Sequence, residues 1–205
     1  DGFVAAFANA NAGDVSPNTW LKPGQGPTND QFKNVKIQGE KQANAVRSQL
    51  KSSGTPVGKG LDSRISYFNF SGMNVDAKYT GSGQNERTCQ GFLGTPFGAG
   101  STEDGGGGWA VYKEGSGRPS ILGTLVFTPS AAQTRCQQPK GILFSAKNGT
   151  IIQEKYPVQI MRFGDYYLLG MPGEFTGAVG VQYRQDAAKL FGVPESHIIL
   201  QGYTN

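Results

Sequence analysis

Hydrophobic positions in the first quarter of the chain follow a helical spacing. Between residues 28 and 50, apolar or small residues recur every three or four positions, which is typical of one face of an amphipathic helix. They are Phe32, Val35, Gly39, Ala43, Val46 and Leu50. Thr28, Asn29 or Asp30 is available as the N-cap, because each has a side-chain oxygen that can accept from the first helical N–H groups. The pattern therefore predicts one long helix with a solvated polar face.

Strand patterns lie at the start of the chain and after this helix. Residues 3–7 are apolar in succession and predict a buried strand. Between residues 61 and 80, apolar and polar positions alternate, which predicts two successive strands. Residues 81–119 are dominated by glycine, with Gly105 to Gly108 in a row, and we expect a long irregular excursion there. Such a loop is either functional or plain irregular surface, and the sequence leaves both interpretations open.

The last third of the chain has the most regular pattern. Two apolar runs, residues 156–163 and 166–171, flank the dipeptide Gly164-Asp165, which suits a hairpin turn. Helical spacing then covers residues 176–191, and an apolar strand returns at residues 198–200. We expect one face of this helix to carry Val179, Tyr183, Ala187, Leu190 and Phe191. The order of strand, turn, helix and strand predicts an α/β fold with a mixed β-sheet, flanking helices and long Gly-rich loops.

Composition and charge restrict the classes of protein to which the chain can belong. The chain has 19 Lys and Arg residues and 15 Asp and Glu residues, which gives a net charge of +4. These charges are scattered along the sequence. This dispersed excess argues against a nucleic-acid partner, which usually needs a clustered basic face. Gly and Pro number 31 and 11 of 205 residues, below the share typical of disordered chains. No stretch approaches the roughly 18 consecutive apolar residues of a membrane span.

The two cysteines, Cys89 and Cys136, both lie in polar contexts. They are either a disulfide or two free thiols, and two cysteines are too few for a Cys-type zinc site. Free thiols are usually buried, so the polar contexts favour a disulfide that ties down the Gly-rich excursion. Such a disulfide is consistent with a secreted, extracellular or cell-surface protein, as are the possible glycosylation sites Asn69 and Asn148.

Three residues are candidates for chemistry, and each also has a purely structural interpretation. Ser16 lies in a polar turn, where it is either a nucleophile or hydrogen-bond donor, or part of an ordinary Asp/Ser/Asn turn. Glu174 falls between a strand and a helix, at the edge where open α/β sheets place their sites. It is either a metal ligand or general base, or a carboxylate that complements the helix dipole. His197 is the one histidine, and its turn-like setting favours a surface-loop role over a place in a catalytic triad.

Two motifs near the ends of the chain resemble those of one enzyme family. The start, through Gly13-Asp14-Val15-Ser16-Pro17-Asn18, is similar to the serine motif of the neutral (alkaline, non-lysosomal) ceramidases. The segment Met171-Pro172-Gly173-Glu174-Phe175-Thr176 resembles that family's zinc-ligand glutamate motif. Between them, segments such as Gly26-Pro27, Thr88-Cys89 and Cys136-Gln137-Gln138-Pro139-Lys140 fall in the family's order. The resemblance thus covers nearly the whole chain.

The resemblance implies a zinc-dependent amide hydrolase that cleaves ceramide to sphingosine and a fatty acid. The enzyme is expected to reach its lipid substrate from the membrane surface. Ser16 matches the catalytic serine, which either attacks directly or holds the water and the developing oxyanion, and Glu174 matches one zinc ligand. The remaining ligands, two histidines before the serine motif and a tyrosine after Gly202-Tyr203-Thr204-Asn205, are expected outside this chain. Residues 1–205 are therefore expected to be the central part of a single ceramidase-like catalytic domain, truncated at both ends and inactive alone.

Two other functions compete with this hypothesis. A secreted non-catalytic module derived from the same fold, with a structural or binding role, is compatible with an incomplete set of zinc ligands. A serine hydrolase that uses His197 is disfavoured, because no Gly-x-Ser-x-Gly elbow surrounds Ser16.

Overall fold

A computed structural model describes residues 2, 6–101, 103–104, 128–145 and 152–204 of the chain. These residues form two compact units, each assembled from separate stretches of sequence. The sheet unit comprises Asp1–Val15, Leu50–Phe68 and Tyr156–Asn205. The disulfide unit comprises Ser16–Gln49 and Asn69–Lys155.

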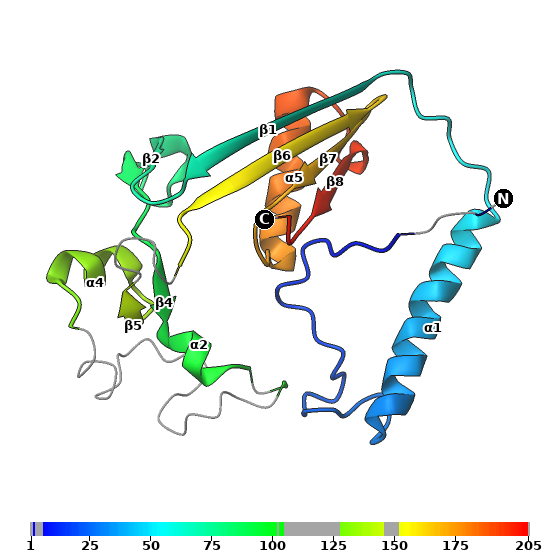
Figure 1. Cartoon of the computed structure of the whole chain (residues 1–205), viewed down its shortest axis with the longest axis horizontal. Coiled ribbons are helices and arrows are strands. Elements are labelled where there is room, and N and C mark those ends of the chain that lie inside the picture. Colours follow the sequence, from blue (N-terminus) through cyan, green and yellow to red (C-terminus); the bar gives the residue numbers. More distant parts are fainter. Residues whose placement is uncertain (1, 3–5, 102, 105–127, 146–151, 205) are drawn as a thin grey trace. The chain divides into compact units, whose positions relative to one another are not determined.

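A four-stranded mixed sheet forms the frame of the sheet unit (Figure 1). Its strands lie in the order β1 (Leu61–Asn69), β6 (Lys155–Phe163), β7 (Tyr166–Gly170) and β8 (Ile198–Gln201). Strands β6 and β7 are antiparallel, whereas β7 and β8 are parallel, as expected for a strand pair joined through a helix. Gly164 makes the hairpin turn between β6 and β7 with a positive φ of 59°. These strands and the following helix confirm the predicted mixed α/β fold.

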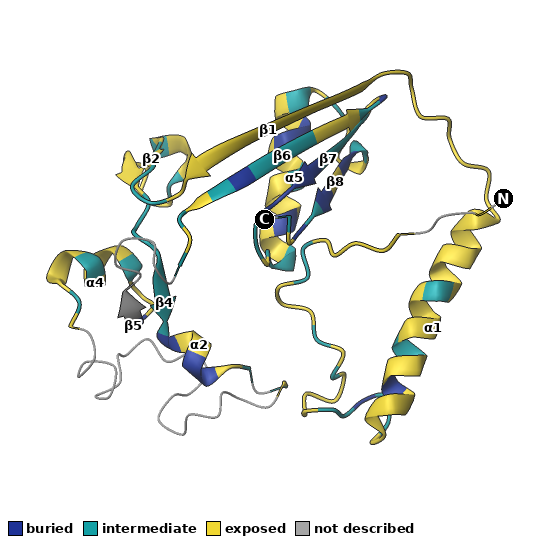
Figure 2. Cartoon of the chain, in the orientation of Figure 1, coloured by how far each residue is buried: buried dark blue, intermediate teal, exposed yellow. Residues whose placement is uncertain are grey.

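Helix α5 (Gly177–Phe191) packs on the parallel pair and builds the core of the sheet unit (Figure 2). Thr176 caps its first turn, and Gly192 ends it in the left-handed conformation. The buried core residues are Leu169, Met171, Ala187, Ala188, Ile198 and Leu200. The predicted inner position of Leu190 is wrong, since this side chain is 79% exposed. Ala188 is buried instead, because α5 contacts the sheet through small side chains that let the helix approach closely.

Helix α1 (Gln31–Leu50) confirms the long helix predicted in the first quarter of the chain. Asp30 is its cap, because Oδ1 accepts from the N–H groups of Phe32 at 2.9 Å and Lys33 at 3.1 Å. The predicted apolar face is mostly exposed in the part of the chain that the structure describes, with Phe32 at 82%. The buried residue of α1 is polar: Asn34 bonds Thr28 and Gly24 and so fixes the preceding loop to the first turn.

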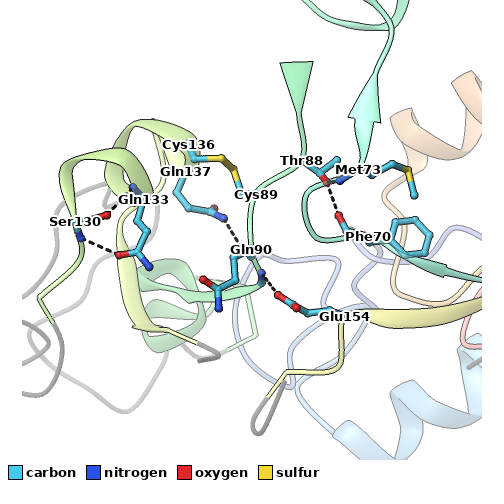
Figure 3. Close-up of a disulfide and its surroundings, with 11 residues drawn as sticks. Phe70, Met73, Thr88, Cys89, Gln90, Ser130, Gln133, Cys136, Gln137 and Glu154 are labelled. Carbon is cyan, nitrogen blue, oxygen red and sulfur yellow. Dashed lines mark hydrogen bonds between the residues drawn. A yellow bond between two sulfur atoms is a disulfide. The ribbon is translucent and has the colours of Figure 1, made fainter. Parts of the chain in front are cut away.

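A disulfide between Cys89 and Cys136 organises the disulfide unit and confirms the predicted pairing (Figure 3). The two Cα atoms are 5.8 Å apart, within the usual range for a disulfide. Beside it, the Glu154 carboxylate accepts from the N–H of Gly91 at 2.9 Å, and the Gln137 amide donates to the carbonyl of Gln90 at 3.4 Å (Figure 3). These contacts join residues 89–91 of the Gly-rich excursion to Cys136, Gln137 and Glu154, which follow it in the sequence.

The Gly-rich excursion contains more regular structure than predicted. Its elements are β3 (Glu86–Arg87), β4 (Phe92–Gly94) and α2 (Thr95–Ala99). Strand β3 pairs with β2 (Asn74–Val75), and β4 pairs with β5 (Ile142–Ser145). A further helix, α4 (Ala131–Gln137), carries Cys136. Residues Gly105 to Gly108 lie outside the described residues.

Two strand predictions need correction. The second strand expected before residue 80 is only the short β2, because Asp76 caps a 3-10 turn, η1 (Ala77–Tyr79), by accepting from the N–H of Lys78. At the start of the chain, Ala6 and Phe7 form no strand, and Phe7 is 70% exposed. Residues 3–5 of that expected strand lie outside the described residues.

Residues 9–14 instead lie across the loop that joins β7 to α5. The N–H of Gly202 donates to the carbonyl of Asn9 at 2.9 Å, and the N–H of Gly13 donates to the carbonyl of Phe175 at 2.8 Å. The Asp14 carboxylate accepts from the N–H of Gly177 at 2.7 Å, where α5 begins. We call residues 9–14 the docking segment, because backbone hydrogen bonds hold it to the rest of the sheet unit.

Gly13→Ala is expected to destabilise the sheet unit. A Cβ at this position would lie 2.4 Å from the backbone carbonyl oxygen of Glu174, which cannot move without displacing the loop. We expect a loss of about 1 to 3 kcal/mol in the free energy of unfolding, measured by denaturant titration of the full-length protein. Gly54→Ala in the same unit is the control, since its Cβ would meet nothing within 4 Å. Equal stability of the two variants would contradict this packing.

Candidate functional site

Ser16 opens a hydrogen-bonded turn in the disulfide unit. Its hydroxyl donates to Oδ1 of Asp104 at 2.7 Å, across a sequence separation of 88 residues. The Ser16 oxygen also accepts from the N–H of Asn18 at 3.2 Å, a local contact of the kind that serine makes in turns. These two contacts anchor the Ser16 oxygen. Because the residue is partly exposed, the oxygen remains accessible.

Asp104 is the residue of this site that the sequence analysis missed. Its carboxylate accepts from Ser16, from the Asn18 amide at 2.7 Å and from the Ser101 hydroxyl at 2.9 Å. These hydrogen bonds, the one from Ser16 first, hold the pKa of Asp104 below its usual value. The carboxylate is therefore ionised at neutral pH. No local pattern marked it, because it lies within the Gly-rich excursion and meets Ser16 only in the folded unit.

Asn18 connects the Ser16 turn to the start of α1. Its amide also donates to the carbonyl of Glu103 at 2.9 Å, and its Oδ1 accepts from the N–H of Gly24 at 3.1 Å. Beside Asn18 lies an open cavity of about 450 Å³, formed between this loop and one face of α1. The residues that line it include Pro17, Asn18, Gly24, Gln31, Val35 and Gln38. Ser16 thus stands next to a hollow surface of the same unit.

Glu174 occupies the predicted position in the sheet unit, after β7 and before α5. Its side chain is exposed and bonds the hydroxyl of Tyr203, an interaction that raises the pKa of that phenol. Tyr203 has a positive φ of 57°, unusual for a residue with a side chain. A carboxylate and a phenol therefore meet where β7 and β8 end.

The serine and glutamate motifs meet through the docking segment. Gly13 and Asp14 of the serine motif bond Phe175 and Gly177, which flank the glutamate motif's helix start. Ser16 follows Asp14 by two positions, but it belongs to the disulfide unit whereas Glu174 belongs to the sheet unit. That Ser16 and Glu174 face one cleft stays a prediction.

His197 has the structural role that its context favoured. It ends the 3-10 turn η3 (Glu195–His197), and its ring stacks on Tyr166 with centroids 4.4 Å apart. Its Nδ1 lies 3.1 Å from the backbone carbonyl of Asp165. In a Ser-His-Asp triad this nitrogen faces a carboxylate instead, so the observed contact does not support a serine hydrolase that uses His197.

The described residues hold part of a metal site at most. Within these ranges, no group of three or more His, Cys, Asp or Glu side chains is placed to hold a metal ion. Glu174 can therefore contribute a single carboxylate ligand. Of the two possible glycosylation sites, Asn69 is exposed at the end of β1, and Asn148 lies outside the described residues.

The chain is similar to known proteins over its whole length. The sequence profile described as "Neutral/alkaline non-lysosomal ceramidase, N-terminal" matches residues 1–205. A neutral ceramidase from Pseudomonas aeruginosa is 36% identical and is matched by 100% of the chain, which spans 31% of that relative. A neutral ceramidase from Mycobacterium tuberculosis is 35% identical, with 99% of the chain and 32% of the relative aligned. The chain thus spans about a third of the length of these relatives.

Solved structures agree with the sequence comparison. A structure titled "Ceramidase complexed with C2" matches 98% of the chain, with a TM-score of 0.74 and 34% identity. The match covers 32% of the length of that solved chain. The neutral ceramidase of Pseudomonas aeruginosa matches 99% of the chain and 30% of its own, with a TM-score of 0.64 and 28% identity. The chain belongs to the neutral/alkaline non-lysosomal ceramidase family.

Proposed function

We propose that the full-length protein hydrolyses the amide bond of ceramide, consuming water and releasing sphingosine and a fatty acid. The observation that carries this proposal is the joining of the serine and glutamate motifs by the hydrogen bonds of Gly13 and Asp14. Relatives that match the chain over both motifs are named neutral ceramidases. The substrate and the reaction are those that this family membership supports.

Ser16 and Glu174 divide the chemistry in this proposal. Ser16 contacts the reacting amide, and its accessible oxygen is held by Asp104 and Asn18. Glu174 is one ligand of a catalytic zinc ion, a role that suits an exposed carboxylate; Tyr203, which bonds this carboxylate, is not a ligand. Two histidines and one tyrosine, expected outside this chain, complete the ligand set. When bound, zinc polarises the amide carbonyl and lowers the pKa of a bound water.

Secretion and access to lipid from the membrane surface belong to the same proposal. The Cys89–Cys136 disulfide supports an oxidising compartment, where disulfides persist. Asn69 is exposed and is available for glycosylation there. None of the helices in the described ranges is long and apolar enough to cross a membrane. Mass spectrometry of the secreted protein, with and without glycosidase treatment, tests this part.

Ser16→Ala is expected to remove most ceramide hydrolysis while zinc remains bound. The hydroxyl touches the reacting amide but is not a metal ligand, so kcat should fall by at least about 10²-fold with an unchanged zinc stoichiometry. Hydrolysis of a fluorescent ceramide and elemental analysis of the full-length protein measure the two effects. Ser82→Ala, which removes an exposed hydroxyl from the same unit, is the control. Full activity of Ser16→Ala would remove Ser16 from the reacting groups.

Glu174→Gln is expected to lose zinc and activity together. A neutral amide is a poorer zinc ligand than a carboxylate, and substitution of groups that merely support a ligand already costs about 10- to 100-fold in affinity. We expect at least that loss, measured by competition with a chromogenic chelator, and a parallel loss of turnover. Glu195→Gln is the matched control, because Glu195 is an exposed carboxylate of the same unit. Unchanged zinc content in Glu174→Gln would remove Glu174 from the ligand set.

A further inference from the structure

The Asp104 carboxylate gathers the polar groups around Ser16. Oδ1 accepts from the Ser16 hydroxyl and the Asn18 amide, both at 2.7 Å, and Oδ2 accepts from the Ser101 hydroxyl at 2.9 Å. Hydrogen bonds to an ionised acceptor are shorter and stronger than those between neutral groups. Asp104 therefore holds the Ser16 turn directly at the Oγ atom of Ser16.

The hydrogen-bond inventory of Ser16 is nearly complete. A serine hydroxyl has one proton to donate and two lone pairs that can accept. Asp104 accepts the proton, and the N–H of Asn18 donates to one lone pair at 3.2 Å. Among the described residues, nothing donates to the other lone pair. These two contacts also select one orientation among the three staggered positions that the side chain could otherwise adopt.

We propose, on the basis of the proposed function, that Asp104 is a positioning residue for ceramide hydrolysis. It holds the Ser16 hydroxyl by its proton, so that Ser16 meets the substrate or an attacking water through its remaining oxygen lone pair. A serine whose proton is committed to Asp104 cannot donate that proton to a developing oxyanion at the same time. The structure thus favours the use of Ser16 as an attacking or accepting oxygen over its use as an oxyanion donor.

A merely structural role for Asp104 predicts different kinetics. If the carboxylate only closed the turn, its removal would lower stability and change kcat regardless of whether Ser16 was present. If it positions Ser16, the effects of the two substitutions cannot add, because residues that act as a unit are strongly non-additive. A double-mutant cycle on kcat therefore separates the two roles.

The experiment measures ceramide hydrolysis by the full-length wild-type protein and the variants D104A, S16A and S16A/D104A. We expect D104A to lower kcat by about 10²-fold with KM nearly unchanged, as for a misplaced reacting group. The double variant should be no slower than S16A. The pair Ser82 and Glu86, another exposed hydroxyl–carboxylate hydrogen bond of this unit, supplies the control variants S82A and E86A. Neither should change kcat.

Each alternative outcome has a definite meaning. A wild-type kcat in D104A, or a further loss of activity in the double variant, would overturn the positioning role while ceramide hydrolysis stood. A wild-type protein inactive on ceramide would overturn the proposed function and this role with it. If D104A shows no cooperative thermal unfolding, D104N decides, since it keeps one acceptor oxygen and loses the charge. We expect about a 10-fold lower kcat in D104N, and an unchanged kcat would contradict the proposal.

Discussion

The contact of the docking segment with the loop between β7 and α5 is the constraint on which the candidate site depends. Two backbone hydrogen bonds and the Asp14 carboxylate hold this segment in place. The approach is possible because glycine stands where a side chain would collide: a Cβ at Gly180 would lie 2.3 Å from the Asn11 side chain, and one at Gly202 would lie 2.8 Å from the Ala10 carbonyl. Glycine at these two positions thus lets the docking segment pack closely within the sheet unit.

The same contact completes the start of α5. A helix leaves its first N–H groups without partners inside the helix. Thr176 accepts from the N–H of Val179, and Asp14, 163 residues earlier in the sequence, accepts from the N–H of Gly177. A carboxylate at this end is also favoured by the helix dipole. The same hydrogen bond from Gly177 to Asp14 therefore stabilises the start of α5 and holds Asp14 of the serine motif in place. Glu174 lies next to Phe175, which accepts from the N–H of Gly13. Within the disulfide unit, Asp104 anchors Ser16.

Local signals in the sequence predicted the sheet unit well. The Gly164-Asp165 turn and the helical spacing over residues 176–191 each depend on nearby residues, and the structure places β6, β7, α5 and β8 accordingly. The Cys89–Cys136 pairing was also predictable, because only two cysteines are present. The strand predicted from the apolar run at residues 3–7 is wrong at Ala6 and Phe7, because hydrophobicity alone does not supply a strand partner. Asp104 was unpredictable for a related reason: its role comes from hydrogen bonds across 88 residues, and no periodicity records them.

The most direct test of the central claim is anomalous diffraction at the zinc edge from crystals of the full-length protein. The account predicts a zinc peak within about 2 Å of the Glu174 carboxylate, which is a normal zinc–oxygen bond length. It also predicts the Ser16 oxygen within roughly 10 Å of that peak, because one amide must reach both groups. A zinc ion held without Glu174, or a Ser16 side chain that faces away from it, would contradict the account.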